Sequence, residues 1–179
     1  MGLFGTFRYH EPWEPVNEAI VAQHGLPVRS LYMDSEKIVD SGDRVLYRVR
    51  RKILSLHGKT DIYDNTTAQL VAHYERVVLS LHYRYCVQMN DGATPELYSS
   101  NDVIEIVPLG WIVRMEGFAR NCTLFDAEGR ILAFIGRKNW SMHNRYSIDI
   151  YVPETEQYIV TIASVIQSMF DDATSNCGE

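Results

Sequence analysis

The chain has 179 residues, of which 46% are hydrophobic and 22% are charged, and its formal net charge is −6. These values are typical of a soluble globular protein with a substantial core in one domain. The acidic balance argues against nonspecific binding to nucleic acid, because such binding needs a positive surface potential. We therefore expect a protein that does not bind nucleic acid.

Cysteine usage and hydropathy give an expected location. Cys86, Cys122 and Cys177 are far apart and have no metal-binding spacing, so we interpret them as reduced thiols in a cytoplasmic protein. The longest apolar-rich run, residues 158–170, is too short to cross a bilayer, and the N-terminus lacks the apolar core of a secretory signal. The first six residues fit the M-G-x-x-x-[ST] pattern for N-myristoylation, so peripheral attachment to a membrane is an alternative.

The first 27 residues are a mixed lead-in that contains Pro12, Pro15 and Pro27 as helix and strand breakers, with one short helix expected over 16–24. From Val28 to Val152, short runs rich in Val, Ile, Tyr and Leu alternate with turn-forming segments. This rhythm predicts an antiparallel all-β domain with about a dozen strands. A closed barrel is favoured because closure leaves no exposed strand edge.

The segment 158–170 differs from the rest because it is apolar on every side of a helical wheel. Such a pattern predicts a buried helix, over about residues 155–170. Glu154 and Glu156 would lie at its positive N-terminal end. We therefore predict a mainly β domain over residues 28–179, in which a closed antiparallel barrel of about 12 strands surrounds a hydrophobic C-terminal helix.

Three segments of 20 residues repeat one pattern: Val45–Asp64, Leu70–Met89 and Ile131–Ile150. Each has an apolar strand, an Arg, the triplet Ser-Leu-His or Ser-Met-His, a cation and a second strand. Repetition of one supersecondary unit indicates a shared packing task, so we interpret each copy as a β-hairpin with the triplet at its turn.

The triplets also allow two chemical interpretations. His57, His82 and His143 could bind a metal if they converged, and Ser55 with His57 could form a catalytic pair. Three equivalent turns spread around a barrel would instead point apart. We therefore expect the histidine rings to cap backbone groups, and we expect no catalytic residue, metal or cofactor.

Positive charge is concentrated in nine residues of this acidic chain, which hold Arg44, Arg48, Arg50, Arg51 and Lys52. Strand alternation places Arg48, Arg50 and Lys52 on one face, and Lys138 is the counterpart of Lys52 in the third repeat. These four residues are the predicted site for the phosphate groups of a lipid headgroup or a nucleotide. The alternative is a solvated strand face that discourages edge pairing.

The order of these motifs resembles the LURP-one-related proteins, part of the tubby C-terminal-like group that also includes phospholipid scramblases. The likeness covers about residues 28–172 and is strongest over Phe118–Phe170, where the strand pair CTLFDAEGRILAFI leads to RKNWS, YSIDI and the apolar helix. It implies a barrel of about twelve strands around a central helix. Members often have other residues where the three triplet histidines stand, which weakens any special role for them.

The resemblance implies less about activity. Tubby relatives bind phosphoinositides through basic barrel residues, and plant LURP-one-related proteins are linked to defence. The cysteine-rich and terminal apolar segments of the scramblases are not evident here, so no scrambling or calcium dependence is expected. We predict a non-enzymatic binding or adaptor module for an anionic ligand. The alternative is a protein–protein scaffold that docks a partner, or a second copy of the chain, through Leu3, Phe4, Phe7 and Trp13.

Overall fold

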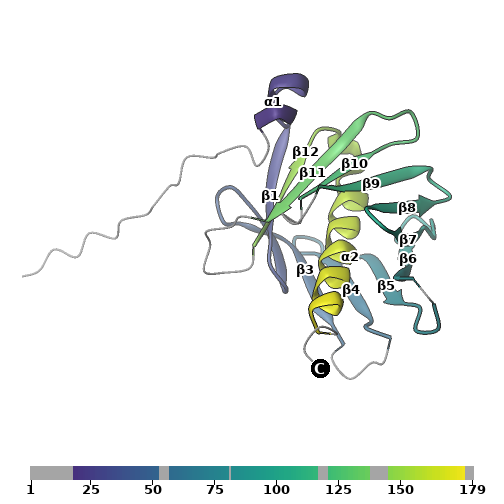
Figure 1. The fold of residues 1–179 in the computed structure, drawn as a ribbon. Helices are drawn as coiled ribbons and strands as arrows, with labels where there is room; N and C mark the ends of the chain where they lie inside the picture. Colours follow the sequence, from purple (N-terminus) through teal and green to yellow (C-terminus); the bar gives the residue numbers. More distant parts are fainter. Residues whose placement is uncertain (1–17, 53–56, 81, 117–120, 138–144, 176–179) are drawn as a thin grey trace, which may run out of the picture.

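The structure is a computed structural model, and it describes residues 18–52, 57–80, 82–116, 121–137 and 145–175. Twelve strands form a closed antiparallel barrel, with helix α2 running lengthwise among them (Figure 1). The strands are β1 (Arg29–Met33), β2 (Lys37–Asp40), β3 (Val45–Arg51), β4 (Thr60–Asp64), β5 (Leu70–Arg76), β6 (Arg84–Met89), β7 (Glu96–Ser100), β8 (Val103–Val107), β9 (Trp111–Glu116), β10 (Asn121–Phe125), β11 (Ile131–Arg137) and β12 (Tyr146–Ile150). The helices are α1 (Glu18–His24) and α2 (Glu156–Ser175), the latter preceded by a 3₁₀ turn, Pro153–Thr155. The predicted fold class is confirmed.

The barrel is closed by pairing between the first and last strands. Every strand pairs with its neighbours in sequence, and β1 also pairs with β12, with Arg29 opposite Ile150 and Met33 opposite Tyr146. Each of the twelve strands therefore has a hydrogen-bonded neighbour on both sides, as the sequence-based argument for closure required.

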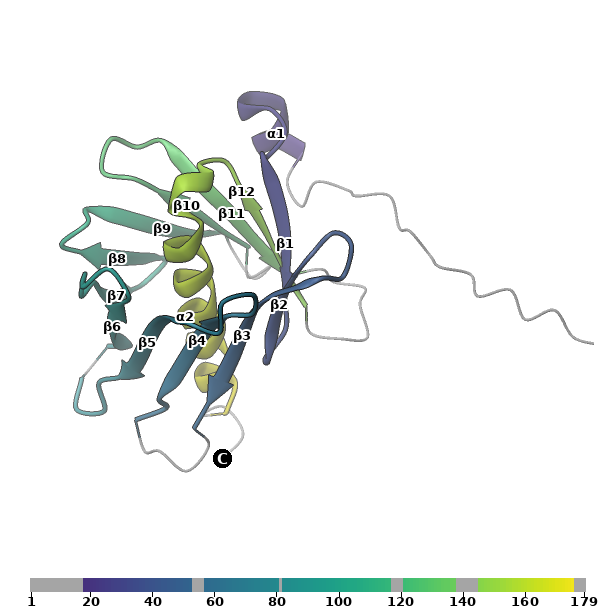
Figure 2. The ribbon, with the colours of Figure 1, turned by 180° about the vertical axis from the view of Figure 1, so that it is seen from behind.

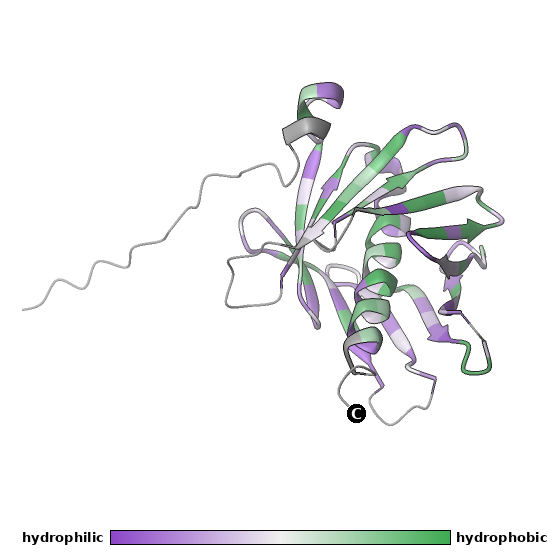
Figure 3. Cartoon of the chain, viewed as in Figure 1, coloured by the Kyte–Doolittle hydropathy of each residue, from purple (hydrophilic) through white to green (hydrophobic). Residues whose placement is uncertain are grey.

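Helix α2 is enclosed on all sides by the barrel. Nine consecutive residues, Ile159–Gln167, are buried, whereas a helix lying on a surface would expose one side in every turn. Seen from the front and from behind, the helix lies between strands β1–β3 on one side and β5–β8 on the other, and hydropathy colouring shows it as predominantly apolar (Figure 1, Figure 2, Figure 3). The helix thus fills the interior that side-chain layers occupy in smaller barrels. Within the described chain, no helix is long and apolar enough to cross a membrane.

Three hydroxyl residues on this buried helix, Thr161, Ser164 and Ser168, have hydrogen-bond partners, as burial in a low-dielectric interior requires. The Thr161 hydroxyl donates to the Gln157 carbonyl at 2.7 Å, and the Tyr74 hydroxyl, from β5, lies 2.8 Å from Ser164 Oγ and 2.9 Å from Ser168 Oγ. Tyr74 therefore joins the barrel wall to the middle of the helix.

The helix continues five residues beyond the predicted end at Phe170. The sequence-based prediction returned the chain to water at Asp171 and Asp172, but both acids remain helical and form ion pairs with barrel arginines, Arg51 and Arg76. At the N-terminus, the described part of the predicted helix is α1, and the aromatic residues of the scaffold hypothesis lie outside the described residues.

The three sequence repeats coincide with three hairpins of the barrel, β3–β4, β5–β6 and β11–β12. In the second copy, the His82 backbone N–H donates to Ser80 Oγ at 3.4 Å. The serine hydroxyl thus accepts a local hydrogen bond from the backbone of the turn. Capping by the histidine rings stays a prediction. Ser55, Ser141 and His143 lie outside the described residues.

Candidate functional site

The predicted basic face exists on the outside of strand β3. Arg48 and Arg50 are exposed and Lys52 follows them on the same face. Pairing brings two further lysines beside them, because Lys37 of β2 is opposite Arg48 and the Lys52 backbone bonds to that of Lys59. We call these five residues, Lys37, Arg48, Arg50, Lys52 and Lys59, the β3 basic patch.

The two arginines of the patch are held in place by neutral neighbours on the β4 side. Arg48 Nε donates to Asn65 Oδ1 at 2.7 Å, and the Arg50 guanidinium lies 5.0 Å from the centre of the Tyr63 ring. Within the described part of the chain, neither guanidinium is paired with a carboxylate. Their charge is therefore available to an anion, and their positions are already restricted before a ligand arrives.

The lysines at the far end of the patch are partly neutralised. Lys52 Nζ lies 3.7 Å from Asp61 Oδ2, and the other oxygen of that carboxylate is 2.6 Å from His73 Nδ1. Lys59 Nζ lies 3.3 Å from Glu75 Oε2. Two of the five cations of the patch are thus ion-paired, and among the described residues the other three are in no ion pair, which leaves local positive charge on a protein of net charge −6.

Lys138, the fourth predicted site residue, lies outside the described residues. It follows β11, which is separated from β3 by β2, β1 and β12. Equivalence between repeats placed Lys138 with Lys52 in the prediction, but the barrel puts their hairpins on different parts of the wall. Sequence reasoning missed Lys37 as a patch residue, because only the strand pairing places it beside Arg48.

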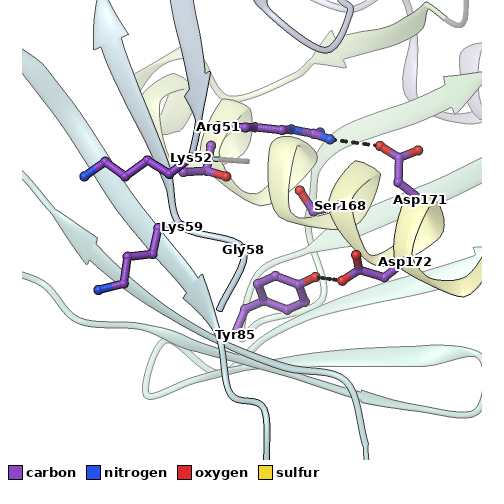
Figure 4. Close-up of a pocket in the computed structure, with 9 residues that line it drawn as sticks. Arg51, Lys52, Gly58, Lys59, Tyr85, Ser168, Asp171 and Asp172 are labelled. Atoms are coloured by element: carbon purple, nitrogen blue, oxygen red, sulfur yellow. Dashed lines mark hydrogen bonds and ion pairs between the residues drawn. The ribbon is translucent and has the colours of Figure 1, made fainter. Parts of the chain in front are cut away.

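The remaining two cations of the sequence cluster have other roles. Arg44 pairs with Asp40, with Nε 3.1 Å from Oδ2. Arg51 faces the barrel interior, as the alternation from Arg50 dictates, and it lines a cavity of about 190 Å³ at one mouth of the barrel (Figure 4).

This cavity lies beside the last turns of α2. Arg51 Nη1 bonds to Asp171 Oδ2 at 3.0 Å, and the Tyr85 hydroxyl donates to Asp172 Oδ2 at 2.6 Å (Figure 4). Burial, and then the bond to Asp172, raise the pKa of Tyr85, so its hydroxyl keeps the proton that it donates. Figure 4 shows Lys52 and Lys59 pointing away from α2, toward the outer face of the barrel.

The recurring arginine of the repeat has a structural role at this mouth. Arg51 and Arg76 end the first strands of two copies, and they pair with the adjacent helix residues Asp171 and Asp172. Cations near a helix C-terminus are also favoured by the negative end of the helix dipole. The repeat therefore supplies the groups that fasten the end of α2 to the wall.

The described histidines provide no metal site. His57 and His82 lie in different connections, β3–β4 and β5–β6, and the His57 carbonyl accepts the Arg76 backbone N–H at 2.8 Å. Among the described residues, no group of three or more His, Cys, Asp or Glu side chains could hold a metal ion.

Comparison with known proteins supports the fold. No protein-family model matches the chain, and a search of curated proteins finds no match. The X-ray structure of a protein from Arabidopsis thaliana, AT5G01750, is similar with a TM-score of 0.59 at 15% sequence identity. The alignment covers 80% of this chain and 93% of the plant chain. At this identity the similarity is one of fold.

Proposed function

We propose that the protein is a non-enzymatic, LURP-one-related barrel that binds an anionic phosphorylated ligand, such as a phospholipid headgroup, through the β3 basic patch. The kinship is supported by the barrel with its enclosed helix, by the similar plant fold and by the order of the sequence motifs. The single observation that carries the ligand class is the exposed pair Arg48 and Arg50.

A planar guanidinium can donate two parallel hydrogen bonds to a phosphate, so two exposed arginines two residues apart on one strand suit a ligand with more than one phosphate oxygen. The barrel makes the strand a rigid support, and Asn65 and Tyr63 orient the two side chains. Ordering such flexible side chains usually costs binding energy, and here part of that cost has been met before binding.

Vesicle flotation tests the proposal. Vesicles of phosphatidylcholine alone and vesicles that also contain a phosphoinositide are mixed with the wild type, with the double variant Arg48→Ala/Arg50→Ala and with a control. The control, Arg114→Ala/Arg130→Ala, removes the same charge from β9 and from the β10–β11 turn, and β9 lies across the barrel from β3.

We expect the wild type and the control to float with the phosphoinositide vesicles. At roughly 1 kcal/mol per cation at an anionic surface, the double variant should bind about 30-fold more weakly. Negligible flotation of the wild type, or equal losses in the two variants, would remove the proposal.

A further inference from the structure

We propose that the turn between β5 and β6 inserts into the surface of an anionic phospholipid bilayer, with the exposed side chains of Val78 and Leu79 as its apolar tip. This inference rests on the proposed function, because it takes the phosphorylated ligand of the β3 basic patch to be a headgroup within that bilayer. We call Val78 and Leu79 the β5–β6 tip.

The β5–β6 tip is presented to solvent on a hairpin with a fixed base. Leu79 is 98% exposed and Val78 is 47% exposed, and hydropathy colouring shows the turn beyond β5 as apolar (Figure 3). The Val77 backbone N–H donates to the Arg84 carbonyl at 2.9 Å, which closes the hairpin just before the tip. A single exposed leucine is ordinary on a protein surface, so the location of the tip carries the argument.

Strand direction places the tip at the mouth of the barrel where α2 ends. Neighbouring strands are antiparallel, so every odd-numbered strand ends at this mouth. Arg51 at the end of β3 and Arg76 at the end of β5 both pair with acids near the end of α2. The His57 carbonyl also accepts the Arg76 backbone N–H at 2.8 Å. The ends of β3 and β5 are therefore neighbours.

The other exposed large hydrophobic side chains of the described chain lie at the opposite mouth. They come before or at the start of an odd-numbered strand, or at the end of an even-numbered one: Leu26, Val28, Leu70 and Val107. Among the described residues, the β5–β6 tip thus holds the exposed large hydrophobic side chains at the mouth toward which the β3 basic patch runs.

The β3 basic patch and the tip can touch one flat surface. Only β4 separates β3 from β5, so the two strands are roughly 10 Å apart along the wall of a twelve-strand barrel. Arg48 and Arg50 face outward near the end of β3, and the tip extends past the end of β5. The acids between them, Asp61 and Glu75, are each paired with a lysine of the patch, so the two arginines supply the attraction to an anionic surface.

The size of the tip suits a bilayer better than a protein partner. A standard protein interface uses roughly 20–30 residues on each side, and two aliphatic side chains could form only a small part of one. Binding at a lipid surface needs no matched partner surface, and its strength grows with the buried apolar area and with attraction to anionic lipid. One weak apolar anchor needs a second signal for stable attachment, and the β3 basic patch supplies it.

The test makes one substitution at the two ends of β5. Leu79→Ser removes the tip leucine, whereas Leu70→Ser, the control, removes a leucine that is 43% exposed at the opposite mouth. Flotation is measured with phosphatidylcholine vesicles that contain a phosphoinositide, and binding of soluble inositol trisphosphate is measured by calorimetry. Circular dichroism confirms that each variant is folded.

A second pair of variants reports insertion directly. Leu79→Trp and Leu70→Trp are mixed with the same vesicles made from lipids with brominated acyl chains, which quench tryptophan fluorescence on contact. The tryptophans of the wild-type chain give the same background in both variants. Insertion of the tip predicts more quenching in Leu79→Trp than in Leu70→Trp.

We expect Leu79→Ser to bind the phosphoinositide vesicles about tenfold more weakly than the wild type, because it no longer transfers a leucine side chain out of water. Leu70→Ser should bind them as the wild type does. Both serine variants should bind inositol trisphosphate as the wild type does, because that ligand has no acyl chains. Arg48→Ala/Arg50→Ala should lose binding to both.

The outcomes separate this inference from the proposed function. If the wild type binds inositol trisphosphate but no vesicles, or if the two serine variants float equally, the inference is overturned and the patch can still bind its ligand. A wild type that binds neither probe overturns both. If Leu79→Ser instead lowers the mass of the protein in the absence of lipid, the tip joins copies of the chain, which also overturns the inference.

Discussion

Enclosure of α2 predicts that truncation should be costly on every side of the helix. Val160, Val165 and Ile166 are 0%, 0% and 1% exposed, and at about 100° per residue they point in three directions roughly evenly spaced around the axis. Replacing either valine by Ala removes two carbons, and replacing the isoleucine removes three. With about 0.8 kcal/mol per carbon and the cost of the cavity left behind, we expect losses of about 2–3 and about 3–4 kcal/mol.

Urea unfolding followed by circular dichroism measures these losses, with unchanged m values showing that the folded state has kept its compactness. Leu79→Ala is the control, because Leu79 is 98% exposed and its truncation should change stability by less than about 0.5 kcal/mol. If any one of the three helix variants unfolds like this control, that side of α2 faces solvent and the reasoning is refuted.

Three further predictions concern the barrel wall and its turns. Tyr74→Phe should lower the free energy of unfolding by about 1–2 kcal/mol, measured in urea, because it removes the hydroxyl that joins β5 to Ser164; an unchanged midpoint would contradict this. Gly110→Ala should lower the free energy of unfolding by about 1 kcal/mol or more in the same assay, because Gly110 has φ +70° and an added Cβ would lie 3.2 Å from the Ala127 Cβ. An unchanged free energy of unfolding would contradict this prediction. The Thr67 backbone N–H lowers the pKa of Asp64 below its ordinary value of 3.8, so this carboxylate stabilises the fold above about pH 4 and less as the pH falls through the lowered pKa. Asp64→Asn keeps an acceptor but does not titrate, so its stability deficit against the wild type should shrink from about pH 6 to about pH 2.5, and a deficit independent of pH would refute the assignment.

The fold could be predicted from the sequence because the two patterns that indicate it, the apolar helix and the hairpin turns, are local. An apolar helix can be recognised from thirteen consecutive residues, and the turn chemistry of the hairpins lies within each repeat. The end of α2 was harder to place, because acids normally mark a return to water. Here Asp171 is held by Arg51, which is 120 residues earlier in the chain, and no local pattern carries that pairing.

The candidate site was predictable only along a single strand. Alternation along β3 correctly put Arg48 and Arg50 on one outward face. The addition of Lys37 depends on the register between β2 and β3, which includes a bulge after Ile38. Arg51 belongs to the basic cluster in the sequence, but the same alternation turns its side chain toward the barrel interior. Its partner there, Asp171, lies near the end of α2 and is distant in the sequence.

The most direct test of anionic-ligand binding is a ¹H–¹⁵N spectrum of the full chain titrated with a soluble inositol trisphosphate. We predict progressive shifts of the backbone and arginine side-chain resonances around Arg48 and Arg50, and their disappearance in Arg48→Ala/Arg50→Ala. Saturating ligand that leaves these resonances unchanged, or that shifts only residues on β8–β10, would contradict the proposed function.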